Sequence, residues 1–243
     1  MPSDPQLVLN RLICDRQTVD LNGSPVEVTG TITSEEAHFM RRLIVENELT
    51  VCLETGVAYG ASTVAIAAAL SELERAGKTV RHYGVDPCQS RVYSGAAIAA
   101  LRDCGLDHIF ELCEGPSHLM LPKLIEQRIR IDFAFIDGMH TFDYTLIDLF
   151  FADKLLRPGG FICVHDMHLP SKRKALKYLM KYRKYSRCHG IRRSLLKRVG
   201  AASKEAARLG LRSSWNSLVV AEPLITARKI EDFEPAWDFF ARI

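Results

Sequence analysis

The sequence lacks any apolar run of the roughly 20 residues that a membrane-spanning helix needs. It also begins without the basic, apolar and small-residue pattern of a signal peptide, since Asp4 comes early and Arg11 interrupts the apolar residues. Its seven cysteines form no C-x-x-C pair, and three of them fall inside predicted strands, where cysteine behaves as a small apolar residue. We therefore expect a cytoplasmic protein with reduced thiols and no membrane span.

The dinucleotide-binding fingerprint Gly-x-Gly-x-x-Gly is absent as well. Counted from Gly56, it would need glycine at two positions where Ala58 and Ala61 stand. This spacing argues against a dehydrogenase.

Neither apolar nor charged residues are scarce, because hydrophobic residues make up 47% and charged residues 25% of the 243 positions. These fractions are ordinary for a globular protein, and the length predicts a single domain with a sizeable core. Within it we distinguish an N-terminal substrate-side segment, a core, a basic helical insertion and a C-terminal strand and tail, at residues 1–33, 34–170, 171–215 and 216–243.

A buried strand, a glycine turn and a helix follow one another in the first half of the chain. The apolar run 50–53 predicts the strand, with Glu54 at its end. Gly56 and Gly60 flank a tight turn, where we expect a side chain to block a ligand. The alanine-rich run 61–75, without proline or internal glycine, predicts the helix. This arrangement is typical of nucleotide-binding sites, because backbone N–H groups and a helix N-terminus face the ligand.

Further strands and helices alternate after this unit. Strands are predicted at 79–86, 109–113, 131–136 and 161–164, with helices at 91–104, 117–128 and 141–156. Polar residues stand where these strands end: Asp86, Ser117, Asp137, His140 and Asp166. Five strand–helix repeats of this kind indicate an α/β fold with a doubly wound sheet, whose strand-end loops carry the chemistry.

Four motifs stand in a fixed order along this pattern. They are Glu54-Thr-Gly-Val-Ala-Tyr-Gly-Ala-Ser-Thr63, Gly84-Val-Asp-Pro87, Ile136-Asp-Gly-Met-His140 and Leu156-Arg-Pro-Gly-Gly-Phe-Ile-Cys-Val-His-Asp166. Together they resemble the class I S-adenosylmethionine (SAM) methyltransferases, in the group of small-molecule O-methyltransferases and cephalosporin-hydroxylase-like enzymes. The resemblance covers about residues 34–170 and a return strand at 216–221. It implies a Rossmann-like seven-stranded sheet with an antiparallel last strand.

The resemblance also implies which residues bind SAM. Asp86 would hold the ribose, with capping of the next helix as the alternative. Ser117 would lie near the adenine, although it could equally cap its own helix. Ser62 would reach the methionine carboxylate from the start of the first core helix. The rest of the pocket would be shaped by Glu54, Gly56, Ala58, Gly60 and Asp137.

His140 is the candidate general base. A hydroxyl acceptor must be aligned with the methyl group and must lose a proton, and the ordinary pKa of histidine lies near neutral pH. The catechol-type O-methyltransferases, which this region resembles, have a base at that place, although theirs is a lysine. The alternative is a histidine that is merely packed or exposed at a helix start.

Asp137 and Asp166 end neighbouring strands, where two carboxylates repel each other unless something positive lies between them. A divalent cation such as Mg²⁺ would serve, and would lower the pKa of a bound hydroxyl. The catechol-type family has Asn or Asp directly after the second aspartate, whereas this chain has Met167, a poor ligand for a hard cation. His165 or His168 could compensate with a softer metal. The alternative is loop capping without any metal.

Residues 172–212 carry fifteen Lys and Arg against the single acid Glu205, although the whole chain has a net charge of only +3. We expect two helices along one edge of the sheet here. The basic side chains could be a solvated face, could attract an acidic or phosphorylated acceptor, or could bind nucleic acid with Tyr178, Tyr182 and Tyr185 as stacking residues.

The resemblance and the residues together predict a SAM-dependent O-methyltransferase that acts on a small molecule. No Asn-Pro-Pro-Tyr-type amine-methylation motif follows the fourth core strand, which favours oxygen over nitrogen as the acceptor. The rivals are an RNA methyltransferase that uses the basic segment and a SAM-binding protein without turnover. A hairpin at Asn22-Gly23 could help to cover the substrate, and apolar residues in the first 45 could pair two subunits.

Overall fold

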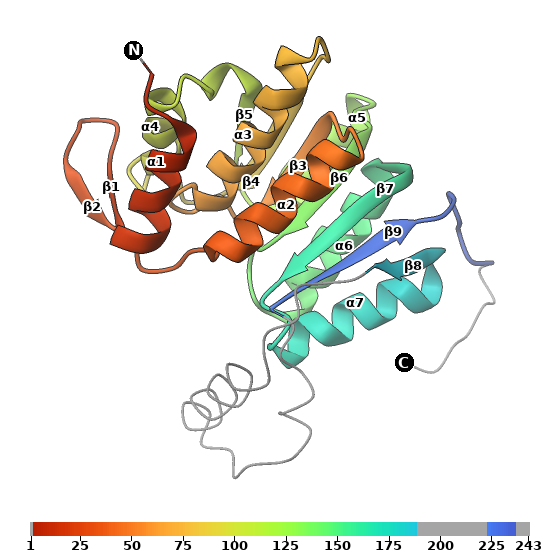
Figure 1. Ribbon diagram of the computed structural model, residues 1–243. Coiled ribbons are helices and arrows are strands. Elements are labelled where there is room, and N and C mark those ends of the chain that lie inside the picture. Colours follow the sequence, from red (N-terminus) through yellow and green to blue (C-terminus); the bar gives the residue numbers. More distant parts are fainter. Residues whose placement is uncertain (1, 189–222, 237–243) are drawn as a thin grey trace, which may run out of the picture.

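The computed structural model describes residues 2–188 and 223–236, and its centre is a seven-stranded sheet with helices on both faces (Figure 1). The strands of this sheet are β3 Val51–Thr55, β4 Arg81–Asp86, β5 Phe110–Glu114, β6 Ile131–Ile136, β7 Leu156–His165, β8 Tyr185–Cys188 and β9 Leu224–Lys229. The helices are α1 Pro5–Asn10, α2 Ser34–Glu46, α3 Ala61–Arg75, α4 Ala96–Asp103, α5 Ser117–Glu126, α6 Phe142–Leu155 and α7 Pro170–Tyr182.

The strand order is β5-β4-β3-β6-β7-β9-β8. Neighbours from β5 to β7 are parallel, whereas β9 runs antiparallel to both β7 and β8. The chain winds outward from β3 to β5 and then returns to β6 on the other side of β3. Ligands of open α/β sheets bind where the winding reverses, at the carboxyl ends of the strands. The predicted doubly wound, Rossmann-like sheet with an antiparallel last strand is confirmed.

Two apolar cores lie on opposite faces of the sheet. One is formed with side chains of α1, α2, α3 and α4, and the other with side chains of α5, α6 and α7. Alanines such as Ala65, Ala67 and Ala69 let α3 lie close to the sheet, since most residues of this helix are buried. A capping box between Thr33 and Glu36 begins α2.

The N-terminal segment contains the predicted hairpin, formed by β1 Gln17–Val19 and β2 Pro25–Glu27 around the Asn22-Gly23 turn. The helix α1 and the short π-helical segment Arg11–Asp15 that follows it were not predicted. Val8 and Leu12 of these two elements are buried in the core that α2 and α3 share.

Several predictions for the second half of the chain need correction. The expected break at 157–160 lies within β7, where the register against β6 shifts. Residues 185–188 form the edge strand β8 rather than a helix, because they pair with β9. The antiparallel strand is β9, at 224–229. The return strand expected at 216–221 and the second basic helix lie outside the described residues.

None of the helices in the described part of the chain is long and apolar enough to span a membrane. The seven cysteines are all free thiols, and Cys52, Cys104 and Cys163 are buried. Exposed apolar side chains among the first 45 residues include Leu7, Val19 and Leu21. Pairing of two subunits through these side chains stays a prediction.

At Gly56 and Gly60, neighbouring backbone atoms leave no room for a side chain. Gly56 has a φ of +85°, and a Cβ there would lie 2.2 Å from the carbonyl oxygen of Asp137. A Cβ on Gly60, whose φ is +91°, would lie 2.8 Å from the Cα of Ala97. The expectation that a side chain here would chiefly block a ligand therefore needs correction. It would first collide with the segment after β6 or with α4.

We expect Gly56→Ala to destabilise the fold more than the matched control Gly77→Ala. Both glycines have a φ of +85°, but a Cβ on Gly77 would have no atom within 4 Å. The left-handed conformation alone costs about 1–2 kcal/mol. Overpacking at Gly56 adds about 1–3 kcal/mol. Urea denaturation measures both losses, and equal values would show that Gly56 is not packed against Asp137.

Candidate active site

Asp86 ties the loop of residues 56–60, which we call the glycine loop, to the end of β4. Its Oδ2 accepts hydrogen bonds from the backbone N–H groups of Val57 (3.0 Å) and Ala58 (2.9 Å), and its Oδ1 accepts one from Cys88 (2.7 Å). The carboxylate thus holds backbone donors of the glycine loop and of Cys88. It does not cap the next helix, because the N-cap of α4 is Gly95. A carboxylate has about four acceptor sites, so three bonds leave room for one more.

Glu54 is fully buried and faces the first turn of α3. Its Oε2 accepts a hydrogen bond from the Thr63 hydroxyl at 2.7 Å, whereas its Oε1 is buried without a hydrogen-bond partner. Burial nevertheless raises the pKa of Glu54 to about 8, so near pH 7 it is a neutral acid. The adjacent His82 is buried and uncharged too, because burial lowers its pKa to about 3. Glu54 therefore secures the start of α3.

The N-terminus of α3 offers backbone donors to an anion. Its N-cap residue, Gly60, makes no side-chain capping bond. The first N–H groups of a helix lack partners within the helix, and the helix dipole favours a negative charge beside them. This end of α3 fits the methionine carboxylate of SAM. Because the Ser62 side chain is buried, the backbone is the better donor to such a group.

Ser117 is the first residue of α5, whose N-cap is Pro116. Because Pro116 holds the N-cap position, the alternative that Ser117 caps α5 is wrong. Its predicted place near an adenine stays a prediction.

Five charged side chains, which we call the strand-end cluster, meet where β6 and β7 end: Asp137, His140, His165, Asp166 and Lys172. Asp137 accepts a hydrogen bond on Oδ1 from Lys172 Nζ at 2.8 Å, and its Oδ2 lies 3.0 Å from His165 Nδ1. His140 Nε2 lies 3.1 Å from Asp166 Oδ2 and 3.7 Å from Asp137 Oδ1. The sheet thus brings together the strand-end residues that the sequence singled out.

Positive and negative groups alternate through this cluster. Burial would raise the pKa of Asp137, but His165 and His140 hold it well below its usual range. The neighbouring carboxylates of Asp137 and Asp166 raise the pKa of His140 to about 9. Burial disfavours a charge on His165, yet its acidic neighbours raise its pKa to about 10. Both imidazoles are therefore protonated at neutral pH. The ordinary pKa expected for His140 needs correction, since it becomes a base only above about pH 9.

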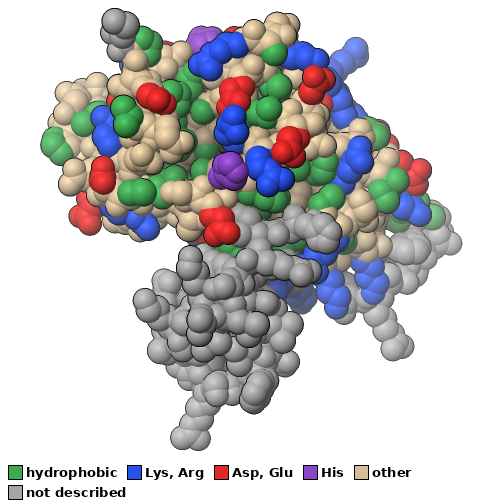
Figure 2. All heavy atoms as spheres, viewed as in Figure 1, with side chains coloured by type: hydrophobic (Ala, Val, Ile, Leu, Met, Phe, Trp, Pro, Cys, Tyr) green, Lys and Arg blue, Asp and Glu red, His purple; other side chains and the backbone are tan. Residues whose placement is uncertain are grey.

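Two residues of the site were not predicted as part of it. Glu36, the capping residue of α2, places its Oε1 3.4 Å from His165 Nε2. Lys172, in the first turn of α7, is fully buried against Asp137, although basic side chains line the outer edge formed by α7 (Figure 2). No feature of the sequence distinguishes Lys172, whose side chain is buried, from the other lysines of α7.

The donor atoms do not fit a hard divalent cation. The nearest oxygen and nitrogen atoms of Asp137, His140 and Asp166 lie within 4.8 Å of one another. However, both oxygens of Asp137 already meet Lys172 or His165, whereas Mg²⁺ demands a near-ideal shell of six oxygen ligands. Met167, which follows Asp166 in the chain, is 2% exposed and packs in the core.

A hollow of about 540 Å³ lies elsewhere, between α1, α2 and α3. Its lining includes His38, Arg41, Glu72 and Arg75, and it contains no residue that was predicted to bind SAM. Arg41 is hydrogen-bonded to Glu72 through two nitrogens. The hollow is therefore separate from the glycine loop and the strand-end cluster.

Comparison with known proteins agrees with this geometry. Residues 53–167 match the family model described as a methyltransferase domain. No curated protein matches the sequence. Among solved structures, the O-methyltransferase TomG from Streptomyces achromogenes, in complex with SAM, has a TM-score of 0.62 at 16% identity, covering 82% of both chains. The O-methyltransferase from Bacillus cereus, in complex with SAH, has a TM-score of 0.60 at 17% identity, covering 77% of this chain and 84% of the other.

A third structure, cofactor-bound Rv0187 from MTB, has a TM-score of 0.62 at 16% identity and covers 84% of both chains. At these identities the likenesses establish the fold. The family match covers the glycine loop, Asp86, His140 and Asp166. The predicted resemblance is confirmed, since residues 53–167 match a methyltransferase domain and the sheet has the class I methyltransferase fold.

We expect the stability of the protein to fall between about pH 4.5 and 8 through Glu54. Its folded-state pKa of about 8 lies above the ordinary value of 4.5, so the folded protein keeps a proton that the unfolded chain releases. This group alone contributes a slope of up to about 1.4 kcal/mol per pH unit. Glu54→Gln removes the titration and keeps a carbonyl oxygen for Thr63.

Urea denaturation of the wild type and the Gln variant at pH 5, 6.5 and 8 measures this effect. The variant should gain stability relative to the wild type as the pH rises. A difference that stays constant across this range would show that Glu54 is not a buried neutral acid.

Proposed function

We propose that this chain transfers the methyl group of SAM to a hydroxyl of a small molecule. The observation that carries the proposal is the contact between the glycine loop and the strand-end cluster. Gly56 packs against the backbone of Asp137, whose N–H donates to the carbonyl of Thr55 at 2.9 Å. A methyl donor held by the loop would therefore lie beside groups that can orient and deprotonate an acceptor.

SAM would supply an electrophilic methyl group on a sulfonium. The first N–H groups of α3 would hold its carboxylate, Asp86 would offer its remaining acceptor site to the ribose, and Ser117 would lie at the adenine. The residues proposed around the cofactor are Glu54, Gly56, Ala58, Gly60, Ser62, Asp86, Ser117 and Asp137. Glu54 and Asp86 contribute chiefly by fixing the shape of the glycine loop, because their bonds to protein groups hold the loop and α3 in place.

On the acceptor side, His140 is the proposed general base. Its side chain is 55% exposed, so an acceptor that arrives from solvent can reach it, whereas the side chains of Lys172 and His165 are buried. Asp166 orients the imidazole through Nε2. In its neutral form His140 would take the proton of the acceptor hydroxyl, and its raised pKa makes it a stronger base than an ordinary histidine.

The solved structures support oxygen as the acceptor, since TomG and the Bacillus cereus protein are both described as O-methyltransferases. The description of TomG places it in Tomaymycin synthesis, which supports a small molecule. The basic residues of α7 leave an acidic or phosphorylated acceptor as a hypothesis.

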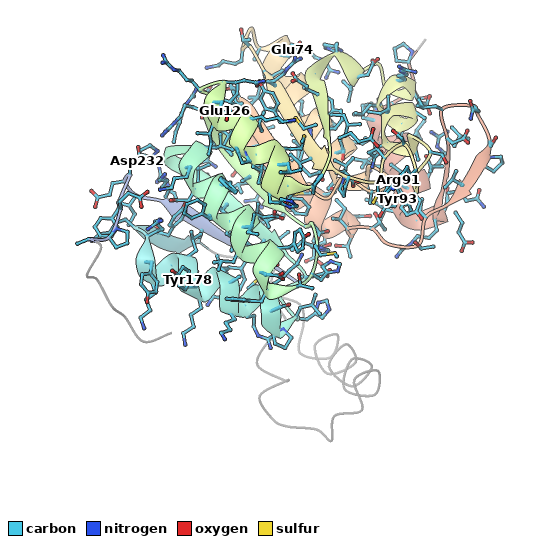
Figure 3. The ribbon with its side chains drawn as sticks, turned by 180° about the vertical axis from the view of Figure 1, so that it is seen from behind. Glu74, Arg91, Tyr93, Glu126, Tyr178 and Asp232 are labelled. Carbon is cyan, nitrogen blue, oxygen red and sulfur yellow. The ribbon has the colours of Figure 1, made fainter. Side chains whose placement is uncertain are left out.

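The tyrosines of the basic segment give less support to an RNA methyltransferase. Tyr185 is 9% exposed, and its hydroxyl donates a hydrogen bond to Asp153. Tyr178 and Tyr182 stack on each other, with ring centroids 4.4 Å apart. Tyr178 lies on the outer side of α7 (Figure 3). Each of these two rings has one face covered by the other, which leaves less aromatic surface for bases.

Calorimetric titration of S-adenosylhomocysteine into the protein tests the cofactor. We expect a single site with a dissociation constant on the order of micromolar, because the loop and the end of α3 are already in place. Transfer of a labelled methyl group is then measured on a panel of phenols and catechols and on RNA. Absence of binding would contradict the proposal, and binding with transfer only to RNA would replace the acceptor class.

Methyl transfer should rise as the pH passes through about 9, because His140 must lose its extra proton before it can act as a base. We expect His140→Gln to lower kcat/KM at pH 9 by about 100-fold or more and to remove this pH dependence. His108→Gln, an exposed histidine paired with Glu74, is the control and should behave like the wild type. A His140→Gln variant that keeps the pH profile of the wild type would exclude His140 as the base.

A further inference from the structure

Lys172 is a fixed cation in the interior of the site. It lies in the first turn of α7, is fully buried, and donates to Asp137 Oδ1 at 2.8 Å. Two residues of the same helix, Ala175 and Leu176, are buried in the apolar core of that face. An ammonium group in such surroundings is stable only when it is paired with an anion. Asp137 is the anion that the structure provides.

Three nitrogen atoms surround the two carboxylates. Lys172 Nζ and His165 Nδ1 each meet one oxygen of Asp137, and His140 Nε2 bridges to Asp166. A divalent cation between these carboxylates would have to displace His140 and would lie beside the ammonium of Lys172, with strong repulsion. The positive charges of Lys172, His165 and His140 thus already compensate the negative charges of Asp137 and Asp166, between which a metal ion was considered.

We propose that Lys172 takes the place of a divalent cation in this methyltransferase, holding Asp137 in position for His140 so that the site works without metal. The inference rests on the proposed function and deepens it. Lys172 is a positioning residue, because it is buried and acts through Asp137. Lys172 is one of the fifteen basic residues at 172–212, and its positive charge belongs to the site.

The class of acceptor follows from this assignment. A metal-dependent site of the catechol type needs two adjacent hydroxyls to chelate the cation, whereas a site built on Lys172 requires only one. The acceptor oxygen forms its bond to the methyl carbon as the bond from that carbon to sulfur breaks, and the hydroxyl proton goes to neutral His140. Phenols with a single hydroxyl should therefore serve as well as catechols.

Binding of Mn²⁺ tests the inference without any assay of activity. Electron paramagnetic resonance measures free Mn²⁺ during titration of the full chain, alone and with S-adenosylhomocysteine and catechol added. We expect no saturable site in the wild type up to about 1 mM, because Lys172 and His165 occupy Asp137. Lys172→Met, which keeps the length of the side chain without its charge, should raise Mn²⁺ affinity about tenfold or more. Lys177→Met removes an exposed lysine of the same helix and should change nothing.

One equivalent of Mn²⁺ bound by the wild type and lost in Asp137→Asn would overturn the inference, even if Lys172→Met failed to fold. A folded Lys172→Met variant that gains no affinity would overturn it too, since Lys172 would then not be what excludes the cation. Binding of S-adenosylhomocysteine, measured on the same samples, distinguishes a failure of the proposed function from a failure of this assignment.

Discussion

The site depends on the close approach of Gly56 to the backbone of Asp137. These residues follow β3 and β6, the two neighbouring strands between which the winding of the sheet reverses. A side chain at position 56 would overlap the carbonyl oxygen of Asp137, so glycine is what allows the two loops to touch. The contact places a loop that is suited to a methyl donor beside the groups that are suited to an acceptor, and every functional proposal made here starts from it.

Electrostatics hold the other half of the site in place. Helices from both ends of the domain meet at the end of β7: α2 contributes Glu36 and α7 contributes Lys172. Each isolated charge would be costly to bury, yet the alternation of Glu36, His165, Asp137 and Lys172 pairs every one of them. Removing one member would leave a partner buried and unpaired. The cluster therefore fixes α2 and α7 relative to the sheet and also holds His140 beside Asp166.

The sequence was most informative where local chemistry decides the structure. It predicted α3 and β6 with their observed bounds, because alanine content, periodicity and the absence of breakers act over a few residues. It also predicted that Asp137, His140 and Asp166 stand at neighbouring strand ends. It could not predict the inward turn of Lys172, since that depends on packing against Asp137, 35 residues away. The strand β8 was missed for the same reason, because its pairing with β9 is a tertiary contact.

A crystal structure of the protein with S-adenosylhomocysteine tests the account most directly. We predict that the carboxylate of the ligand meets the first N–H groups of α3, and that its sulfur faces the gap between Gly56 and His140. A ligand bound in the hollow between α1, α2 and α3, or with its sulfur turned away from the strand-end cluster, would contradict it.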